Sequence, residues 1–227
     1  MPLLILGLFF ALVLGPQLWA RAVLARYAAV RDDIPGSGAE FACHLLRRAG
    51  LGEYAVEAAT GGTGDHFDPQ RRCVVLAAPH HDGRSLAAMV VAAHEVGHAI
   101  QHYIGYRPLF VRQRLARFAV GLERWGAIVL VAMPFVTVMT RSPAAGALLL
   151  LVGGAVMLVP VAVHLVTLPV EFDASFARAL PILERGYLGP ADLPAARRIL
   201  TACALTYVAG ALVSVLNFRR WIRLLRR

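Results

Sequence analysis

The chain has 227 residues, of which 58% are hydrophobic, and its mean hydropathy of +0.62 indicates a membrane protein rather than an ordinary globular domain. The net charge is +9 and all 23 basic residues are arginine, but no aromatic residues interleave with them, so we expect contacts with lipid headgroups and no nucleic-acid partner. Three widely spaced cysteines exclude a disulfide framework.

The N-terminal part of the chain predicts an anchor followed by a polar region. Residues 1–20 are almost wholly apolar and lack the leading positive charge of a signal peptide, so we expect an uncleaved transmembrane anchor. Residues 21–119 form the longest polar stretch and are expected to be the catalytic region. Within it, the apolar residues near 73–77 follow a turn-rich segment and predict a short β-strand.

The most informative motif, HEVGH at residues 94–98, lies in a helix predicted over residues 86–104. Ser85 is a good N-cap residue at the start of this helix. Gly105 and Pro108 are typical of the region just beyond a helix C-terminus. The motif is therefore expected in the middle of a largely apolar helix.

Two histidines four residues apart lie on one helical face, so His94 and His98 can offer two nitrogens to a single zinc ion. Glu95 is placed to take a proton from a water at that ion. The alternative is a helix with two surface histidines, but the apolar neighbours favour a buried site in which each histidine needs a partner. Gly97 predicts that another backbone packs closely against this face.

A transmembrane hairpin is expected from residues 120–169. Two apolar segments, 125–140 and 144–169, are separated only by Arg141, Ser142 and Pro143. Pro160 is expected to kink the second segment.

The hairpin would return residues 170–199 to the membrane side of the catalytic region. Arginines are concentrated on that side, which the positive-inside rule places in the cytoplasm. Residues 200–227 are expected to form an apolar C-terminal helix with an arginine-rich tail, and the sequence leaves open whether residues 202–216 cross the membrane or pack into the bundle. A multi-pass protein of the bacterial cytoplasmic membrane is the predicted arrangement.

Catalytic zinc usually takes a third protein ligand, and Glu171, which opens the polar region after the hairpin, is the best candidate. Asp173 is its rival, although on a helix it points about 200° away from Glu171. Ser175, one turn after Glu171, could orient a ligand by a hydrogen bond. A third-histidine scheme fails, because Gln101 and Ile104 stand where it needs Gly and His.

Several segments together resemble the YugP-type family of bacterial membrane zinc metallopeptidases, also known as neutral zinc metallopeptidases. These segments are GDHFDP at 64–69, GRSLAA at 83–88, HEVGHAIQ at 94–101, LPVEFDAS at 168–175 and LTYVA at 205–209. The resemblance implies an integral membrane, zinc-dependent peptidase. The segment around Glu171 is also similar to the third-ligand helix of membrane gluzincins, which carry an aspartate where this chain has Ser175.

We therefore expect a mainly α integral membrane protein with three to four transmembrane helices and a zincin-like catalytic domain that carries a small β element. Its predicted function is zinc-dependent endopeptidase, acting on protein or peptide substrates at the lipid bilayer. His81 and Tyr207 are further candidates for stabilising an oxyanion. The alternatives are an inactive zinc-binding membrane scaffold or adaptor and a metal hydrolase that does not cleave peptides.

Overall fold

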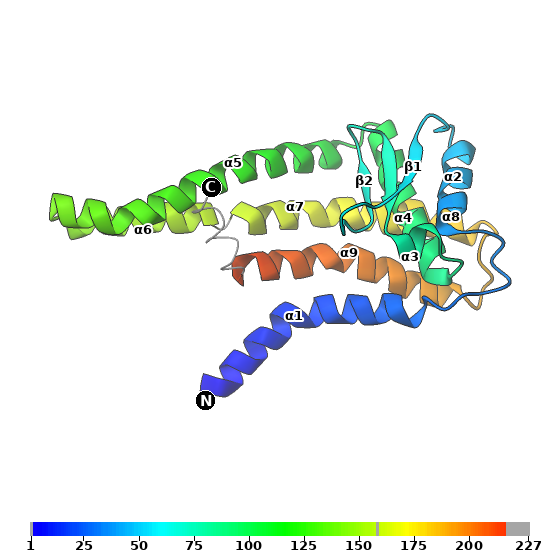
Figure 1. Cartoon of the computed structure of the whole chain (residues 1–227), viewed down its shortest axis with the longest axis horizontal. Coiled ribbons are helices and arrows are strands. Elements are labelled where there is room, and N and C mark those ends of the chain that lie inside the picture. Colours follow the sequence, from blue (N-terminus) through cyan, green and yellow to red (C-terminus); the bar gives the residue numbers. More distant parts are fainter. Residues whose placement is uncertain (1, 158, 217–227) are drawn as a thin grey trace.

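Helices dominate the computed structural model, which describes residues 2–157 and 159–216 (Figure 1). The arginine-rich tail expected at the end of the chain lies outside these residues. The elements are α1 (Pro2–Arg26), α2 (Gly38–Arg48), β1 (Ala55–Ala58), β2 (His66–Asp68), β3 (Cys73–Leu76), α3 (Ala78–His81), α4 (Leu86–Tyr103), α5 (Arg107–Thr140), α6 (Pro143–Met157), α7 (Val159–Phe172), the π-helix η1 (Asp173–Ala179), α8 (Leu180–Glu184) and α9 (Leu193–Leu216).

A three-stranded sheet with the order β1-β3-β2 lies at one end of the molecule (Figure 1). The central strand β3 is buried at every position, which explains its continuous apolar run. It pairs in parallel with β1, where Val56 faces Val74, and antiparallel with β2, where Phe67 faces Val74. The strand predicted near residues 73–77 is confirmed, and β2 is left as an edge strand beside α4.

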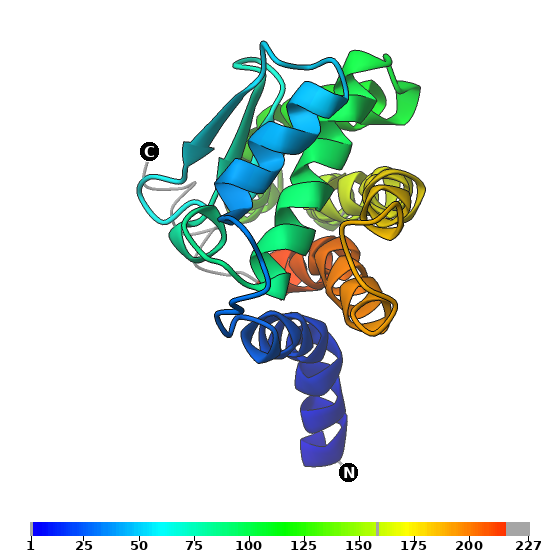
Figure 2. The same cartoon turned by 90° about the vertical axis from the view of Figure 1, so that its right-hand side faces the viewer.

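Helix α4 lies between the sheet and α2 on one side and η1 and α9 on the other (Figure 2). It begins at the predicted residue and ends one residue before the predicted bound, and the Ser85 hydroxyl accepts a hydrogen bond from the Ala88 amide (3.1 Å), as an N-cap should. Its residues are buried almost throughout, which accounts for an apolar sequence on every side of the helix. The HEVGH motif is thus held inside the packed core.

Gly97 allows α4 and η1 to approach each other closely. A Cβ atom at this position would lie 2.7 Å from the carbonyl oxygen of Ala174. Real Cβ atoms do not come so close to a backbone oxygen, so a larger residue would push the two helices apart. The close backbone approach predicted from Gly97 is confirmed.

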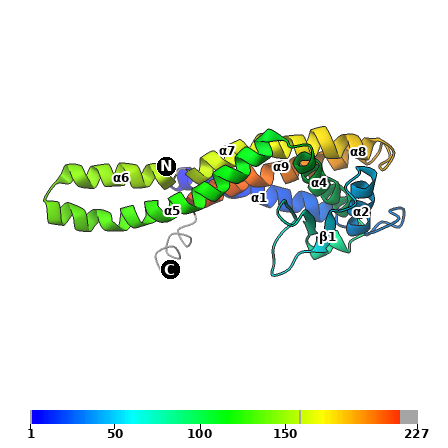
Figure 3. The ribbon, with the colours of Figure 1, turned by 90° about the horizontal axis from the view of Figure 1, so that it is seen from above.

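The remaining long helices extend away from the sheet as a bundle (Figures 1 and 3). Helix α1 packs along α9, α9 along α7 and α7 along α5, and α5 pairs with α6. The turn between α5 and α6 falls at Arg141, which has a left-handed backbone conformation with φ of 51°. The turn therefore falls where the sequence separates the two apolar segments.

The prediction of three to four transmembrane helices is wrong for the part of the chain that the structure describes. In that part, no helix combines the length and the apolar character that a membrane crossing requires. The inference that the active site faces the cytoplasm depended on a crossing hairpin and is withdrawn with it. The mainly helical architecture with a small sheet is what the structure has.

Candidate metal centre and active site

Three buried side chains from two helices meet at one point. His94 and His98 come from α4, and Glu171 comes from the last turn of α7. The Oε2 atom of Glu171 lies 3.2 Å from Nε2 of His94 and 3.2 Å from Nε2 of His98. The three residues are 3%, 4% and 0% exposed. Among the described residues this is a group whose donor atoms, all within 4.8 Å of one another, could hold a metal ion.

His94 is oriented by Ser175 of η1. The Ser175 hydroxyl donates its single proton to the carbonyl oxygen of Leu200 (3.2 Å), so in the 3.0 Å contact with His94 the Nδ1–H must be the donor. The Nε2 atom of His94 then carries a lone pair directed at Glu171. Ser175 thus contacts the ring of a candidate ligand, and its role in orienting that ligand stays a prediction.

His98 is oriented by a different partner, Gln101. The amide nitrogen of Gln101 donates to the carbonyl oxygen of Val170 (2.8 Å) and to Oδ2 of Asp173 (2.8 Å). Its Oε1 atom must therefore accept a hydrogen bond from the Nδ1–H of His98 (2.9 Å). Both histidines consequently have the same tautomer, with Nε2 available to a metal ion.

Asp173, the rival third ligand, is not part of the cluster. Its carboxylate accepts the hydrogen bond from Gln101 and forms an ion pair with Arg178 (3.2 Å). The chain changes from α-helix to π-helix between Phe172 and Asp173. Glu171 and Asp173 therefore have separate roles. Glu171 lies among the histidines, whereas Asp173 accepts a hydrogen bond from Gln101, the side chain that orients His98.

The carboxylate of Glu171 and the ring of His98 shift each other's pKa values toward the charged forms. Burial raises the pKa of Glu171, but the two histidines outweigh this effect and hold its pKa well below the usual value. Burial lowers the pKa of His98, and the Glu171 carboxylate reverses this and raises the pKa to about 9. Of the described buried side-chain atoms, Oε1 of Glu171 has no hydrogen-bond partner, although Nη1 of Arg112 lies 3.7 Å away.

These observations pass the test for a metal site. Two imidazole nitrogens and one carboxylate converge, both opposite ring nitrogens are already hydrogen-bonded, and a buried carboxylate oxygen lacks a hydrogen bond. Two histidines and one glutamate form one of the usual protein ligand sets of catalytic zinc. The donors therefore fit zinc.

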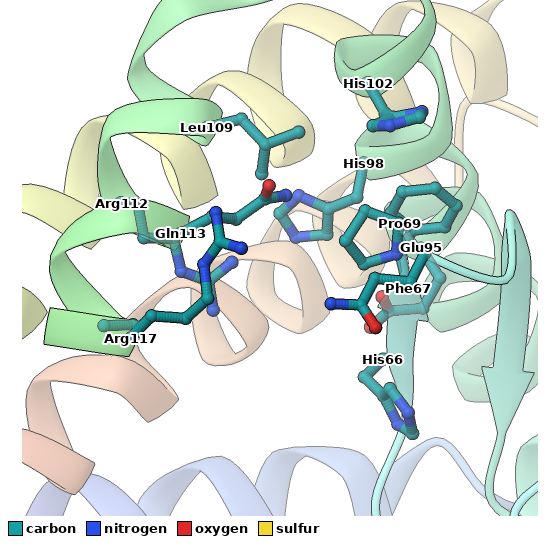
Figure 4. Close-up of a pocket in the computed structure, with 12 residues that line it drawn as sticks. His66, Phe67, Pro69, Glu95, His98, His102, Leu109, Arg112, Gln113 and Arg117 are labelled. Carbon is teal, nitrogen blue, oxygen red and sulfur yellow. The ribbon is translucent and has the colours of Figure 1, made fainter. Parts of the chain in front are cut away.

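Glu95 lies beside this cluster and lines a cavity of about 390 Å³ together with His98 (Figure 4). It is 6% exposed. Burial raises its pKa, and the nearby histidines partly oppose that rise. A carboxylate with a raised pKa is a better base near neutral pH. The other residues lining the cavity are His66, Phe67, Pro69, Gln70, His102, Leu109, Arg112, Gln113, Ala116 and Arg117.

The two oxyanion candidates from the sequence stay predictions. The ring of His81 contacts Asp82 (2.6 Å), and His81 is not among the residues that line the cavity. Tyr207 belongs to α9, but its side chain lies outside the described part of the chain.

Sequence reasoning missed the roles of Gln101 and of the α5 arginines. Gln101 was weighed only as a departure from a third-histidine motif, although its place one turn after His98 was a usable signal. Nothing in the sequence indicated that Arg112 and Arg117 would face the cavity, because that depends on how α5 packs over α4.

Comparison with known proteins agrees with this geometry. Residues 2–226 match a family described as "Putative neutral zinc metallopeptidase". A relative from Bacillus subtilis (strain 168), named "Putative membrane protease YugP", is 35% identical over 222 residues, which cover 92% of this chain and 91% of the relative. No solved structure matches. The resemblance predicted from the motifs is confirmed, and the chain belongs to this family of zinc metallopeptidases.

Proposed function

We propose that this protein is a zinc-dependent endopeptidase in which His94, His98 and Glu171 hold Zn²⁺ and Glu95 is the general base. The observation that carries this proposal is that Oε2 of buried Glu171 lies 3.2 Å from Nε2 of both His94 and His98, while Glu95 and His98 line the same cavity. Family membership supports peptide bonds as the substrate class.

The ion, when bound, supplies Lewis acidity that polarises a peptide carbonyl and makes a water acidic near pH 7. Glu95 accepts a proton from the attacking water and then delivers it to the leaving amine. Its raised pKa suits it to both steps, because it binds the proton more readily than an ordinary carboxylate does. Ser175 and Gln101 keep the two imidazoles in the tautomer that presents Nε2.

An extended substrate is expected to bind along β2. This strand is an edge of the sheet, and its residues His66 and Phe67 line the cavity that contains Glu95. The free backbone groups of an edge strand can pair with a substrate strand, which would bring a peptide bond beside Glu95.

The lipid bilayer is proposed as the place of action, although no helix of the described residues is long and apolar enough to span it. The support is the name of the Bacillus subtilis relative and the large apolar side chains exposed along α5, among them Phe118, Trp125 and Phe135. Purified protein should float with phospholipid vesicles, and Phe118→Ser with Trp125→Ser should reduce the bound fraction. Protein that stays in the vesicle-free fraction under all lipid compositions contradicts this placement.

Metal analysis combined with peptide cleavage tests the proposed function. Wild type purified without chelators should contain about one zinc per chain and cleave casein or membrane peptides. Glu95→Gln should keep the zinc and lose cleavage. A wild type without stoichiometric metal points to the inactive scaffold. A wild type that binds zinc but cleaves no peptide points to another hydrolase.

A further inference from the structure

The face of α5 that covers the cavity is polar and basic. The cavity-lining residues of this helix are Leu109, Arg112, Gln113, Ala116 and Arg117. Their spacing of three, four, seven and eight residues from the first is that of a single helical face. Figure 4 shows this face of α5 turned toward His98 and Glu95. The long side chains of α5 therefore form one wall of the active site.

The two arginines on this wall have different surroundings. Nη1 of Arg112 lies 3.7 Å from Oε1 of Glu171, so Arg112 belongs to the immediate surroundings of the metal cluster. Arg117 is exposed and lies five residues further along α5. Among the described residues that line the cavity, Glu95 is the only acidic one. The wall thus offers positive charge to whatever enters beside the scissile bond.

We propose that Arg117 binds a carboxylate of the substrate, with Gln113 beside it on the same wall, and so makes the enzyme selective for peptides with a negative charge close to the cleaved bond. This inference rests on the proposed peptidase function. A guanidinium group can donate two parallel hydrogen bonds to one carboxylate, which makes arginine suited to this task.

The spacing along α5 indicates where that carboxylate lies. Five residues of α-helix separate Arg112 from Arg117, which is ~7.5 Å along the axis. An extended chain covers this length in roughly two residues. The charge is therefore expected about two residues from the scissile bond, either as an Asp or Glu side chain or as the free C-terminus of a short substrate.

Matched peptides distinguish these two sources. A neutral peptide is first cleaved by the zinc-loaded wild type, and the cut is located by mass spectrometry. A first set of variant peptides carries Glu in place of Gln two residues before or two residues after the cut. A second pair ends two residues after the cut, one peptide with a free carboxylate and the other with a carboxamide. Wild type should prefer at least one charged peptide by about tenfold in kcat/KM, as a hydrogen-bonded ion pair would give.

Variants of α5 assign that preference to Arg117. Arg117→Gln should abolish the preference, and Arg117→Lys should keep part of it, because lysine retains the charge without the planar fork. Arg117→Glu should favour a peptide with Lys at the same position. Arg114→Gln removes an equal charge from an exposed site of α5 that does not line the cavity, and it should keep the wild-type preference.

Binding to Glu95→Gln separates this inference from the proposed function. This variant should bind the charged peptide about tenfold more tightly than its neutral partner by fluorescence anisotropy, and the added Arg117→Gln change should remove the difference. If the protein cleaves nothing yet shows this difference, the peptidase proposal fails and the carboxylate site stands. Equal binding of charged and neutral peptides, or a preference that survives Arg117→Gln, overturns the carboxylate site.

Discussion

The two helical segments that build the metal centre differ in their winding and in what they contribute. Helix α4 is a regular α-helix whose four-residue spacing places His94 and His98 on one face. The segment from α7 to η1 is regular up to Phe172 and then continues as a π-helix of seven residues. The regular part supplies Glu171, whereas the π-helical part supplies Ser175 and Asp173, which act on the histidines directly or through Gln101.

This difference separates donor atoms from the groups that orient them. The three proposed ligands come from regular α-helix, and two of the orienting side chains come from the π-helix. Single π-helical turns within helices are frequent at functional sites. We therefore predict large effects from changes to the three donor residues and smaller, graded effects from changes to the side chains that orient the histidines.

Replacing the third ligand should have the largest effect. Glu171→Ala removes the only carboxylate of the cluster and should abolish stoichiometric zinc binding, as measured by metal analysis of the purified protein. Asp173→Ala is the matched control, because it removes a carboxylate two residues away that points to Gln101. If Asp173→Ala loses the zinc and Glu171→Ala keeps it, the ligand assignment is wrong.

Replacing the general base should abolish catalysis and spare the metal. Glu95→Gln keeps the size of the side chain but cannot accept the proton, so kcat should fall by about 10²–10⁴-fold. Zinc content should stay at the wild-type level, because the Glu95 carboxylate is not among the three converging donors. A variant with wild-type cleavage would remove Glu95 from the mechanism.

Changing Gln101 should weaken zinc binding without abolishing it. Gln101→Leu removes the acceptor of the His98 Nδ1–H bond and the donor to Val170 and Asp173. Zinc affinity, measured by competition with a chelator, should fall by about 10–100-fold. Gln101→Glu retains the acceptor and should lose less. Equal zinc affinity in Gln101→Leu and wild type would show that Gln101 does not orient His98.

The smallest effect is expected from the contact between α4 and η1. Gly97→Ala would bring a methyl group against the Ala174 carbonyl and should lower the free energy of unfolding by ~1–3 kcal/mol, as measured by denaturant titration. Gly121 is also inside a helix, but apart from its chain neighbours and the adjacent backbone of that helix no described atom lies within 4 Å of its Cβ position. Gly121→Ala should therefore be neutral or stabilise by up to about 1 kcal/mol.

The parts of the fold that depend on local signals could be predicted from the sequence. Ser85, the spacing of His94 and His98, and Gly105 define α4 within the chain itself, and the structure has that helix. The strands β1 and β2 were missed, because they have only four and three residues and lack a clear apolar alternation. They exist because each pairs with the buried strand β3.

Features that depend on tertiary packing could not be derived from local sequence signals. Hydropathy marks apolar runs but does not show which of them share a helix with polar residues, and in the described part of the chain no helix combines the length and the apolar character of a membrane crossing. The hydrogen bonds of Gln101 join residues about seventy positions apart. No local sequence pattern predicts a contact between residues so far apart in the chain. The groups that orient the histidines could therefore be identified only from the three-dimensional structure.

Zinc K-edge X-ray absorption of the purified, zinc-loaded protein tests the central claim most directly. We expect two imidazole nitrogens at about 2.0–2.1 Å and oxygen ligands at about 2.0–2.2 Å, with one of the oxygens lost in Glu171→Gln. Sulfur at about 2.3 Å, or a spectrum that His98→Ala leaves unchanged, would contradict it, because the metal would then lie outside the His94, His98 and Glu171 cluster.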